Sequence, residues 1–252
     1  MTSIKRLYAL LAVLCLLLCG CERQLPVETA MPTDEPSTVP VDPPKRTAPI
    51  HSGIREDGTF DKGTLFIGDS LTNGFLFENL MLYDRIGDAR YMAIVGTPVQ
   101  SYFQGPKLHR ELSAIYSGEF NGLTFAQGVE RVGSEITAVY FMLGSNYSEY
   151  TTYETYDKIV AHLLEHCPNA TVYLQTIPYS TSEYVEYEKV NGILEQLALE
   201  YAESVDTRVL LIDTHTAFGD RLREDGIHIN YEAQEIWYQT LLDFAEENNI
   251  PQ

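Results

Sequence analysis

Five short stretches of the chain are apolar almost without interruption. Their polarity does not alternate from residue to residue, which is typical of strands buried on both faces of a parallel sheet. They are also rich in β-branched and aromatic residues, which favour strands. The predicted strands are Thr64–Ile67, Tyr91–Val95, Ala138–Leu143, Thr171–Ile177 and Val209–Ile212.

Helix-like patterns lie between and after these strands. In Tyr153–Cys167, Glu186–Glu203 and Tyr231–Asn248 the apolar residues recur every three or four positions, which predicts helices with one buried face. Strands and helices in alternation predict a single α/β domain, doubly wound, with a five-stranded parallel sheet and helices on both faces. In such a sheet the functional site lies outside the carboxyl ends of the strands.

The first 20 residues have the pattern of an export signal. Lys5 and Arg6 give a positive start, and Leu7–Leu18 follows as a run of 12 residues without charge. A membrane-spanning helix needs roughly 20 apolar residues, so this run is too short to cross a bilayer. It fits the apolar core of a signal peptide.

The end of this segment, Leu18-Cys19-Gly20-Cys21, resembles the lipobox of bacterial lipoproteins. That resemblance implies that residues 1–20 are removed and that Cys21 carries the lipid. The expected location is then outside the cytoplasm, with the chain lipid-anchored to the bacterial cell membrane. A plain secretory signal with incidental cysteines is the alternative.

Residues 21–52 read as a flexible tether. Seven of the 12 prolines lie there, among Thr, Ser and acidic residues, and large apolar side chains are scarce. Such a segment cannot bury enough surface to offset the entropy of ordering its backbone. We therefore expect one folded domain over residues 53–252, carried on a Pro-rich tether.

Composition narrows the possible partners. The whole chain has a net charge of −19, and loss of residues 1–20 removes Lys5 and Arg6 but no acid, which makes the mature charge −21. Nucleic acid is therefore an improbable partner, because phosphate contacts need clustered Lys and Arg. An anionic membrane surface would also repel the chain, so we expect membrane contact only through the N-terminal lipid. Cys167 is the single cysteine beyond Cys21, which excludes a disulfide within the domain and a Cys-rich zinc site.

Three polar motifs lie at the ends of predicted strands or at the start of a predicted helix. Gly68-Asp69-Ser70-Leu71 follows the first strand, Gly144-Ser145-Asn146 follows the third, and Asp225-Gly226-Ile227-His228 precedes the last helix. A serine on a tight turn from strand to helix has an exposed hydroxyl. To act as a nucleophile it needs a base, and the base needs a carboxylate to hold its tautomer. The three-residue spacing of Asp225 and His228 can bring these two groups together on one loop.

Together, in this order, the motifs resemble the SGNH (GDSL-type) esterase and acylhydrolase family over roughly residues 62–242. This resemblance implies a flavodoxin-like SGNH hydrolase fold. It also implies that Ser70 is the nucleophile, His228 the general base and Asp225 the acid that orients it. The family's oxyanion hole implies three donors: the Ser70 N–H, the Gly96 N–H and the side-chain amide of Asn146.

The sequence departs from the family pattern at one position, and a second position can be assigned to either of two glycines. Where the family's third block reads Gly-x-Asn-Asp, Tyr147 replaces the last Asp, which leaves the anchoring of that loop open. Gly105 is the alternative to Gly96 as the residue whose backbone N–H donates to the oxyanion. Taken singly, each motif also fits an ordinary turn before a capped helix, since Asp, Ser and Asn are favoured there.

Three further histidines offer alternatives. His162 and His166 stand four apart on a predicted helix and could bind a metal, but a solvated helix face is the more ordinary interpretation. His215 could compete as the base, although it lacks the Asp-x-x-His spacing. We expect no metal and no cofactor.

The expected function is hydrolysis of O-acyl esters by a Ser-His-Asp serine esterase. The export signal favours an extracytoplasmic substrate, and O-acetyl groups on cell-wall or other glycans are the leading expectation. A lipase or lysophospholipase, an acyltransferase to a glycan, and a non-catalytic tethered glycan-binding module stay open as alternatives.

Overall fold

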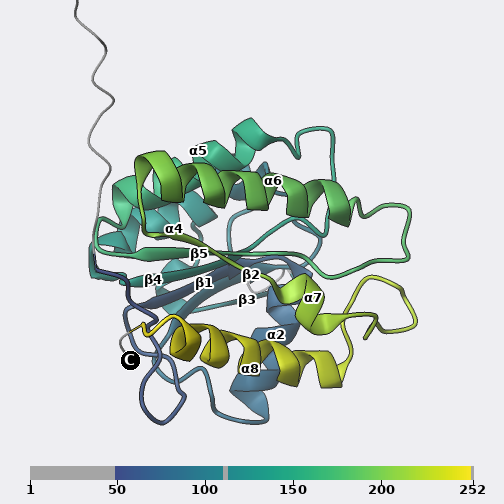
Figure 1. The fold of residues 1–252 in the computed structure, drawn as a ribbon, viewed down its shortest axis with the longest axis horizontal. Coiled ribbons are helices and arrows are strands. Elements are labelled where there is room, and N and C mark those ends of the chain that lie inside the picture. Colours follow the sequence, from purple (N-terminus) through teal and green to yellow (C-terminus); the bar gives the residue numbers. More distant parts are fainter. Residues whose placement is uncertain (1–48, 110–112, 251–252) are drawn as a thin grey trace, which may run out of the picture. The chain divides into compact units, whose positions relative to one another are not determined.

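The structure, a computed structural model, describes residues 49–109 and 113–250 (Figure 1). The predicted signal peptide, Cys21 and nearly all of the predicted tether lie outside the described residues. Within the described ranges, none of the helices combines the length and the apolar character needed to span a membrane.

A single sheet forms the centre of the domain. All five predicted strands are present and run parallel to one another, which confirms the predicted parallel α/β sheet. The order across the sheet is β3-β2-β1-β4-β5-β6. The bounds are β1 Thr64–Gly68, β2 Arg90–Ile94, β3 Ala114–Tyr116, β4 Ala138–Met142, β5 Thr171–Gln175 and β6 Val209–Ile212.

The predicted count of five strands was wrong by one. The sixth strand, β3, lies at the edge of the sheet and pairs antiparallel with β2. It has only three residues, and all three are half-buried. Its apolar run, Ala114-Ile115-Tyr116, is only three residues long and is therefore shorter than each of the five runs that identified the other strands.

Helices cover both faces of the sheet, as predicted. Figure 1 shows α4, α5 and α6 over one face and α2 and α8 over the other. The three predicted helices end within a few residues of their predicted bounds, and α6 continues into a π-helical turn at Tyr201–Val205. The bounds are α2 Ser70–Met81, α3 Ser101–Gln104, α4 Phe125–Val132, α5 Tyr153–His166, α6 Tyr187–Glu200, α7 Thr214–Phe218 and α8 Tyr231–Glu247.

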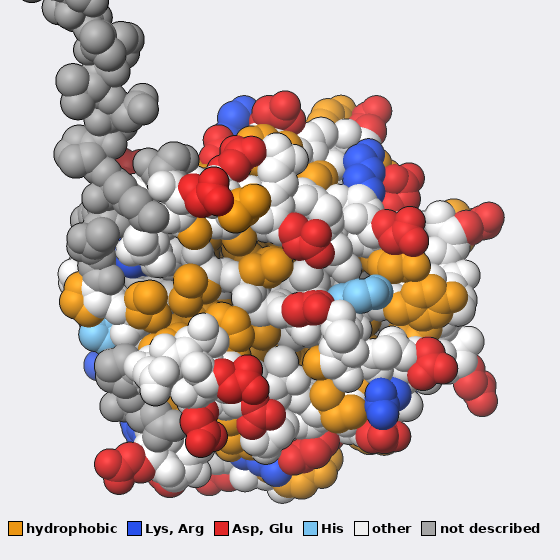
Figure 2. Space-filling model, in the orientation of Figure 1, with side chains coloured by type: hydrophobic (Ala, Val, Ile, Leu, Met, Phe, Trp, Pro, Cys, Tyr) orange, Lys and Arg blue, Asp and Glu red, His pale blue; other side chains and the backbone are white. Residues whose placement is uncertain are grey.

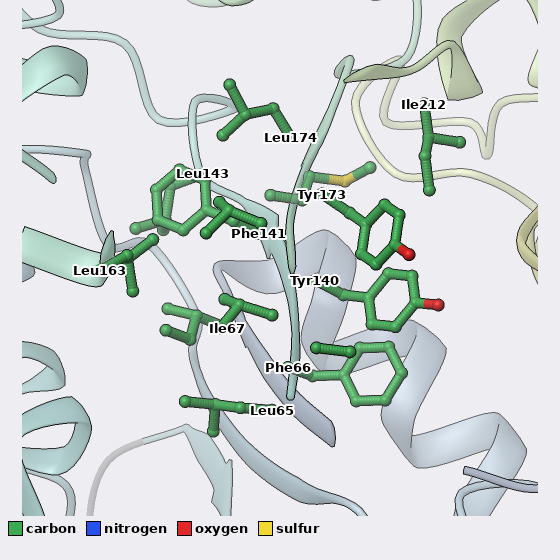
Figure 3. Packing of buried hydrophobic residues seen from close by; sticks show 14 of the residues in the cluster. Leu65, Phe66, Ile67, Tyr140, Phe141, Leu143, Leu163, Tyr173, Leu174 and Ile212 are labelled. Carbon is green, nitrogen blue, oxygen red and sulfur yellow. The ribbon is translucent and has the colours of Figure 1, made fainter. Parts of the chain in front are cut away.

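Aromatic side chains form a ladder across the middle of the sheet. Phe66, Tyr140 and Tyr173 stand in register on β1, β4 and β5, and their rings stack at centroid distances of 5.1 and 4.8 Å (Figure 3). Phe75 of α2 and Phe244 of α8 contact the two ends of this ladder. The ladder therefore joins the central strands to the helices on one face, and it holds rigid the strands that end at the site.

Two tyrosines of this ladder also form hydrogen bonds with the first described residues of the chain. The hydroxyl of Tyr140 donates to the Ser52 carbonyl, and that of Tyr173 donates to the His51 carbonyl, both at 2.7 Å. His51 also donates its N–H to Thr171. The division of the chain at residue 53 stays a prediction.

The surface is strongly acidic in character. On the face shown in Figure 2, Asp and Glu side chains are spread across the whole view, with few Lys and Arg side chains among them. This distribution agrees with the excess of 36 acidic over 17 basic residues in the sequence.

Candidate active site

Residues from three adjacent strands meet at the carboxyl edge of the sheet. Ser70 follows β1, Gly96 lies two residues after β2, and Asn146 lies four residues after β4. From β1 the chain goes to β2 on one side, and it later returns to β4 on the other side. This reversal of strand order opens a crevice where α/β proteins bind ligands.

Ser70, His228 and Asp225 form a continuous hydrogen-bonded chain. The Oγ atom of Ser70 is 2.9 Å from Nε2 of His228, and Nδ1 of His228 is 2.8 Å from Oδ2 of Asp225. A carboxylate can only accept, so Nδ1 carries the proton and Nε2 has the free lone pair. In this tautomer the Ser70 hydroxyl donates to His228, which is the arrangement needed to remove its proton.

A short hairpin holds His228 in place. Leu222 and Ile229 pair as an antiparallel bridge on either side of the turn that contains Asp225 and His228. At the tip, the Gly226 carbonyl accepts hydrogen bonds from Ser180 Oγ and the Thr181 N–H, which dock the hairpin on the loop after β5. Gly226 has φ 69°, and a Cβ there would come within 2.1 Å of the Thr181 hydroxyl. Glycine is therefore required between Asp225 and His228.

The environment of Asp225 keeps it ionised. Burial alone would raise its pKa, but the backbone N–H groups of His228 and Ile227 both donate to Oδ1, and the His228 side chain donates to Oδ2. These hydrogen bonds outweigh burial and lower the pKa of Asp225 to about 2. An ionised Asp225 holds the tautomer of His228 and stabilises an imidazolium when it forms.

Asp69 joins two of the motifs, a role that the sequence analysis missed. It is fully buried, and its Oδ1 caps α2 by accepting the Leu71 N–H at 3.0 Å. Its Oδ2 accepts from the Gly144 N–H, the Ser145 N–H and the Ser145 hydroxyl, the last at 2.7 Å. Burial raises the pKa of Asp69, while these hydrogen bonds act in the opposite direction. The loop carrying Asn146 is thus bound directly to the turn carrying Ser70.

The three expected oxyanion donors differ from the triad in having few protein partners. Among residues 49–109 and 113–250, the N–H groups of Ser70 and Gly96 have no hydrogen-bond acceptor. The Asn146 amide donates weakly, at 3.3 Å, to the adjacent Ser145 hydroxyl. Gly96 has φ 74° and is exposed, with open space where a Cβ would stand. None of the three donors is therefore held by a strong acceptor among the described residues.

The structure answers two questions that the sequence left open: the role of Gly105 and the anchoring of the loop at Tyr147. Gly105 donates its N–H to the Ser101 carbonyl at 2.7 Å, closing the α3 turn, so Gly105 has no free N–H to offer. Tyr147, which replaces the family's Asp, accepts a hydrogen bond from Nζ of Lys189 of α6, and Lys189 also lies 4.8 Å from the centre of the Tyr147 ring. The loop after β4 is thus anchored through Asp69 and Lys189.

A cavity of about 200 Å³ opens beside Ser70 and His228. Leu71, Asn73, Gly74, Val95, Arg223, Ile229 and Gln234 complete its lining. Gln234 is only 3% exposed, and within the described part of the chain its Oε1 has no hydrogen-bond partner. A buried, unpaired acceptor is costly unless a ligand supplies a donor. Nothing in the sequence around Gln234 distinguished it from an ordinary helix residue.

The other histidines lie away from Ser70. His215 stacks on Tyr187, with ring centroids 5.3 Å apart, and lines a different cavity. The expected solvated face at His162 was wrong: its side chain is 12% exposed, and Nδ1 is 3.0 Å from the Tyr102 hydroxyl. Burial lowers the pKa of His162 more than its contact with Glu130 raises it.

Comparison with known proteins supports the fold. No protein-family model matches the sequence, and no curated protein matches it. Solved structures do match: a carbohydrate esterase of family 3 from Talaromyces cellulolyticus superposes with a TM-score of 0.51 at 16% identity, covering 73% of this chain and 96% of that chain. A protein from Bacteroides fragilis, provisionally assigned as an acylhydrolase, superposes with a TM-score of 0.52 at 13% identity, covering 79% and 91%. The structural neighbours of this fold thus include esterases and acylhydrolases.

Proposed function

We propose that this protein is a serine esterase in which Ser70 is the nucleophile, His228 the general base and Asp225 the residue that orients the base. The observation that carries this proposal is the unbroken chain of hydrogen bonds from Ser70 Oγ through His228 to Asp225. It lies beside a cavity, at the edge of the sheet where α/β enzymes place their sites.

The first half of the reaction forms an acyl-enzyme. Ser70 Oγ attacks the ester carbonyl carbon while its proton passes to His228 Nε2. The carbonyl oxygen takes the negative charge and accepts hydrogen bonds from the Ser70 N–H, the Gly96 N–H and the Asn146 amide. These donors matter most at this stage, because they act on charge that exists only in the tetrahedral intermediate. The bond to the alcohol then breaks, and His228 gives its proton to the departing oxygen.

The second half releases the acid. Water attacks the acyl carbon and passes a proton to His228 Nε2, and the same donors stabilise the second oxyanion. When the bond to Ser70 breaks, His228 returns the proton to Oγ. Asp225 stays ionised throughout and stabilises the imidazolium in both halves.

The substrate that we propose is a short-chain O-acyl ester, with O-acetyl groups of a glycan first among them. A cavity of about 200 Å³ is smaller than the roughly 300–1,000 Å³ of most ligand pockets, which favours a small acyl group. Asn73, Arg223 and Gln234 contribute polar side chains to the lining of this cavity, which suits a substrate that carries hydroxyl groups. The carbohydrate esterase from T. cellulolyticus shows that an esterase can be built on this architecture.

We also propose that the enzyme works outside the cytoplasm, attached to the membrane through lipid on Cys21. The support is the signal-like segment 1–20 and its lipobox-like end, together with the net charge of −19, which an anionic membrane surface would repel. Replacement of Cys21 by Ser should move the protein from the membrane fraction to the soluble fraction in a detergent-partition assay.

Two measurements test the proposed chemistry. A fluorophosphonate probe should label the wild-type protein and leave Ser70→Ala unlabelled, since only an activated serine reacts. A series of p-nitrophenyl esters from acetate upward, paired with O-acetylated glycans, should show the highest turnover for the shortest acyl chains. Absence of labelling together with glycan binding would support a binding module instead. Acylated glycan appearing only when an acceptor glycan is added would support a transferase.

A further inference from the structure

Three potential metal ligands converge on the helical face opposite α2 and α8. His162 and His166 stand one turn apart near the end of α5, and Glu130 comes from the last turn of α4. One ligand atom from each of the three side chains lies within 4.8 Å of the others. The spacing of the two histidines is visible in the sequence, but only the packing of α4 against α5 adds the carboxylate.

The spacing of these atoms fits a shared cation better than it fits a hydrogen bond. His162 Nε2 and Glu130 Oε1 are 3.4 Å apart, which is long for a hydrogen bond. Two ligands bound at 2.0–2.1 Å in tetrahedral zinc coordination are separated by about 3.3 Å. The rings of His162 and His166 lie with their centroids 4.3 Å apart, and one nitrogen of each ring lies within 4.8 Å of the other and of a Glu130 oxygen.

Tyr102 orients the central ligand. Its hydroxyl is 3.0 Å from Nδ1 of His162, and Tyr102 is itself fully buried. If Nδ1 donates its proton to that hydroxyl, Nε2 is left with a lone pair directed at Glu130. A hydrogen bond to the second ring nitrogen is the usual way in which proteins hold a metal-binding imidazole.

We propose that Glu130, His162 and His166 bind a zinc ion that joins α4 to α5, with water in the remaining coordination position. Two imidazole nitrogens favour Zn²⁺ over the hard cations Ca²⁺ and Mg²⁺, which select oxygen ligands. The two helices lead into the amino ends of β4 and β5, whereas Ser70 lies at the carboxyl edge, so this ion has a structural role separate from ester hydrolysis. It would cross-link two helices in a domain that has no disulfide among its described residues.

Zinc titration by calorimetry tests the proposal on the mature chain carrying Cys21→Ser, which removes the Cys21 thiol as a competing ligand. We expect one zinc ion per chain. Glu130→Gln and His166→Gln should each weaken binding by about 100-fold or more, and Tyr102→Phe by about tenfold, the lower range for loss of a partner behind the ligand. Tetrahedral Co²⁺ absorption in the visible range should appear with the wild-type residues and disappear with Glu130→Gln.

Matched control variants distinguish specific coordination of zinc from non-specific attraction of Zn²⁺ to acidic side chains. Glu154→Gln removes the same charge from an exposed position at the other end of α5, and His109→Gln removes an exposed histidine elsewhere. Both should bind zinc as the parent does. The proposal is overturned if the parent binds no zinc, or if Glu130→Gln binds as tightly as Glu154→Gln. Circular dichroism without metal checks folding, and Glu130, half exposed, is a position where the change should not disturb the fold.

Discussion

The two sides of the candidate active site are built differently. On one side Ser70, His228 and Asp225 already hold one another through hydrogen bonds of 2.9 and 2.8 Å. On the other side the Ser70 and Gly96 N–H groups have no acceptor among the described residues, and the Asn146 amide has only a weak contact with its neighbour Ser145. The base side finds its partners within the protein, whereas in the proposed reaction the substrate would complete the donor side.

This difference follows from what each side does in the proposed reaction. A base must hold its tautomer and position before the substrate arrives, so both of its ring nitrogens need hydrogen-bond partners within the protein. Oxyanion donors must stay available for a charge that does not yet exist, so any strong protein partner would compete with that charge. Asp69 connects the two sides, because it caps the Ser70 helix and also binds the loop that carries Asn146.

Removal of the nucleophile should have the largest effect. Ser70→Ala should lower turnover by a factor on the order of 10⁶, as loss of the nucleophile does in other serine hydrolases. The melting temperature should stay near that of wild type, since only a hydroxyl is lost. Steady-state assays on a p-nitrophenyl ester measure this, with the exposed Ser134→Ala as the matched control. Turnover above a few per cent of wild type would remove Ser70 from the role of nucleophile.

Loss of the orienting acid comes next. Asp225→Asn should reduce turnover by a factor on the order of 10⁴, because an amide can donate to Nδ1 and so stabilise the wrong tautomer of His228. The exposed Asp220→Asn, on the same segment, should retain full turnover. Equal activity in the two variants would show that His228 is oriented by some other group.

The donor side should give a smaller and more selective loss. Asn146→Ala should lower turnover by about 10²–10³ while the Michaelis constant changes little, since the ground-state carbonyl uses this donor weakly. Melting temperature, turnover and Michaelis constant measured on one preparation decide between roles. A lower melting temperature with near-normal turnover would make Asn146 a structural residue of its loop.

The link between the two sides should appear in stability as well as in activity. Asp69→Asn places an amide group where the carboxylate accepts from Leu71, Gly144 and Ser145, so at least one buried donor loses its acceptor. The free energy of unfolding should fall by about 1–3 kcal/mol, and turnover should fall because both loops shift. Urea denaturation measures the first quantity. Asp84→Asn, at an exposed position with φ 52° that Asn tolerates well, should be neutral.

The smallest expected effect is a pH dependence on the base side. The folded state lowers the pKa of Asp225 to about 2, below its usual value, so its contribution to stability is present above about pH 4 and is lost as the pH falls towards about 2. The difference in melting temperature between wild type and Asp225→Asn should therefore narrow over that range. A difference that stays constant from pH 5 to pH 2 would mean that Asp225 is not held ionised by its hydrogen bonds.

Patterns that are local in the chain were sufficient for most of the architecture. Continuous apolar runs identified five strands because burial on both faces leaves no place for polar side chains. The motif Asp225-Gly226-Ile227-His228 encodes its own hairpin, since a glycine with positive φ lets the two side chains meet across one turn. The edge strand β3 escaped detection because its apolar run is only three residues long, too short to stand out from an ordinary loop.

Contacts between distant segments are what the chain order could not reveal. Ser70 and His228 are 158 positions apart, Asp69 and Ser145 are 76 apart, and their contacts exist only because strand ends converge at one edge of a folded sheet. Glu130 joins His162 only where α4 packs against α5. The pattern of apolar and polar residues around a position indicates whether that position is buried. It does not indicate which distant segment packs against it. Which partner a buried or half-buried polar group meets is therefore decided by the tertiary structure alone.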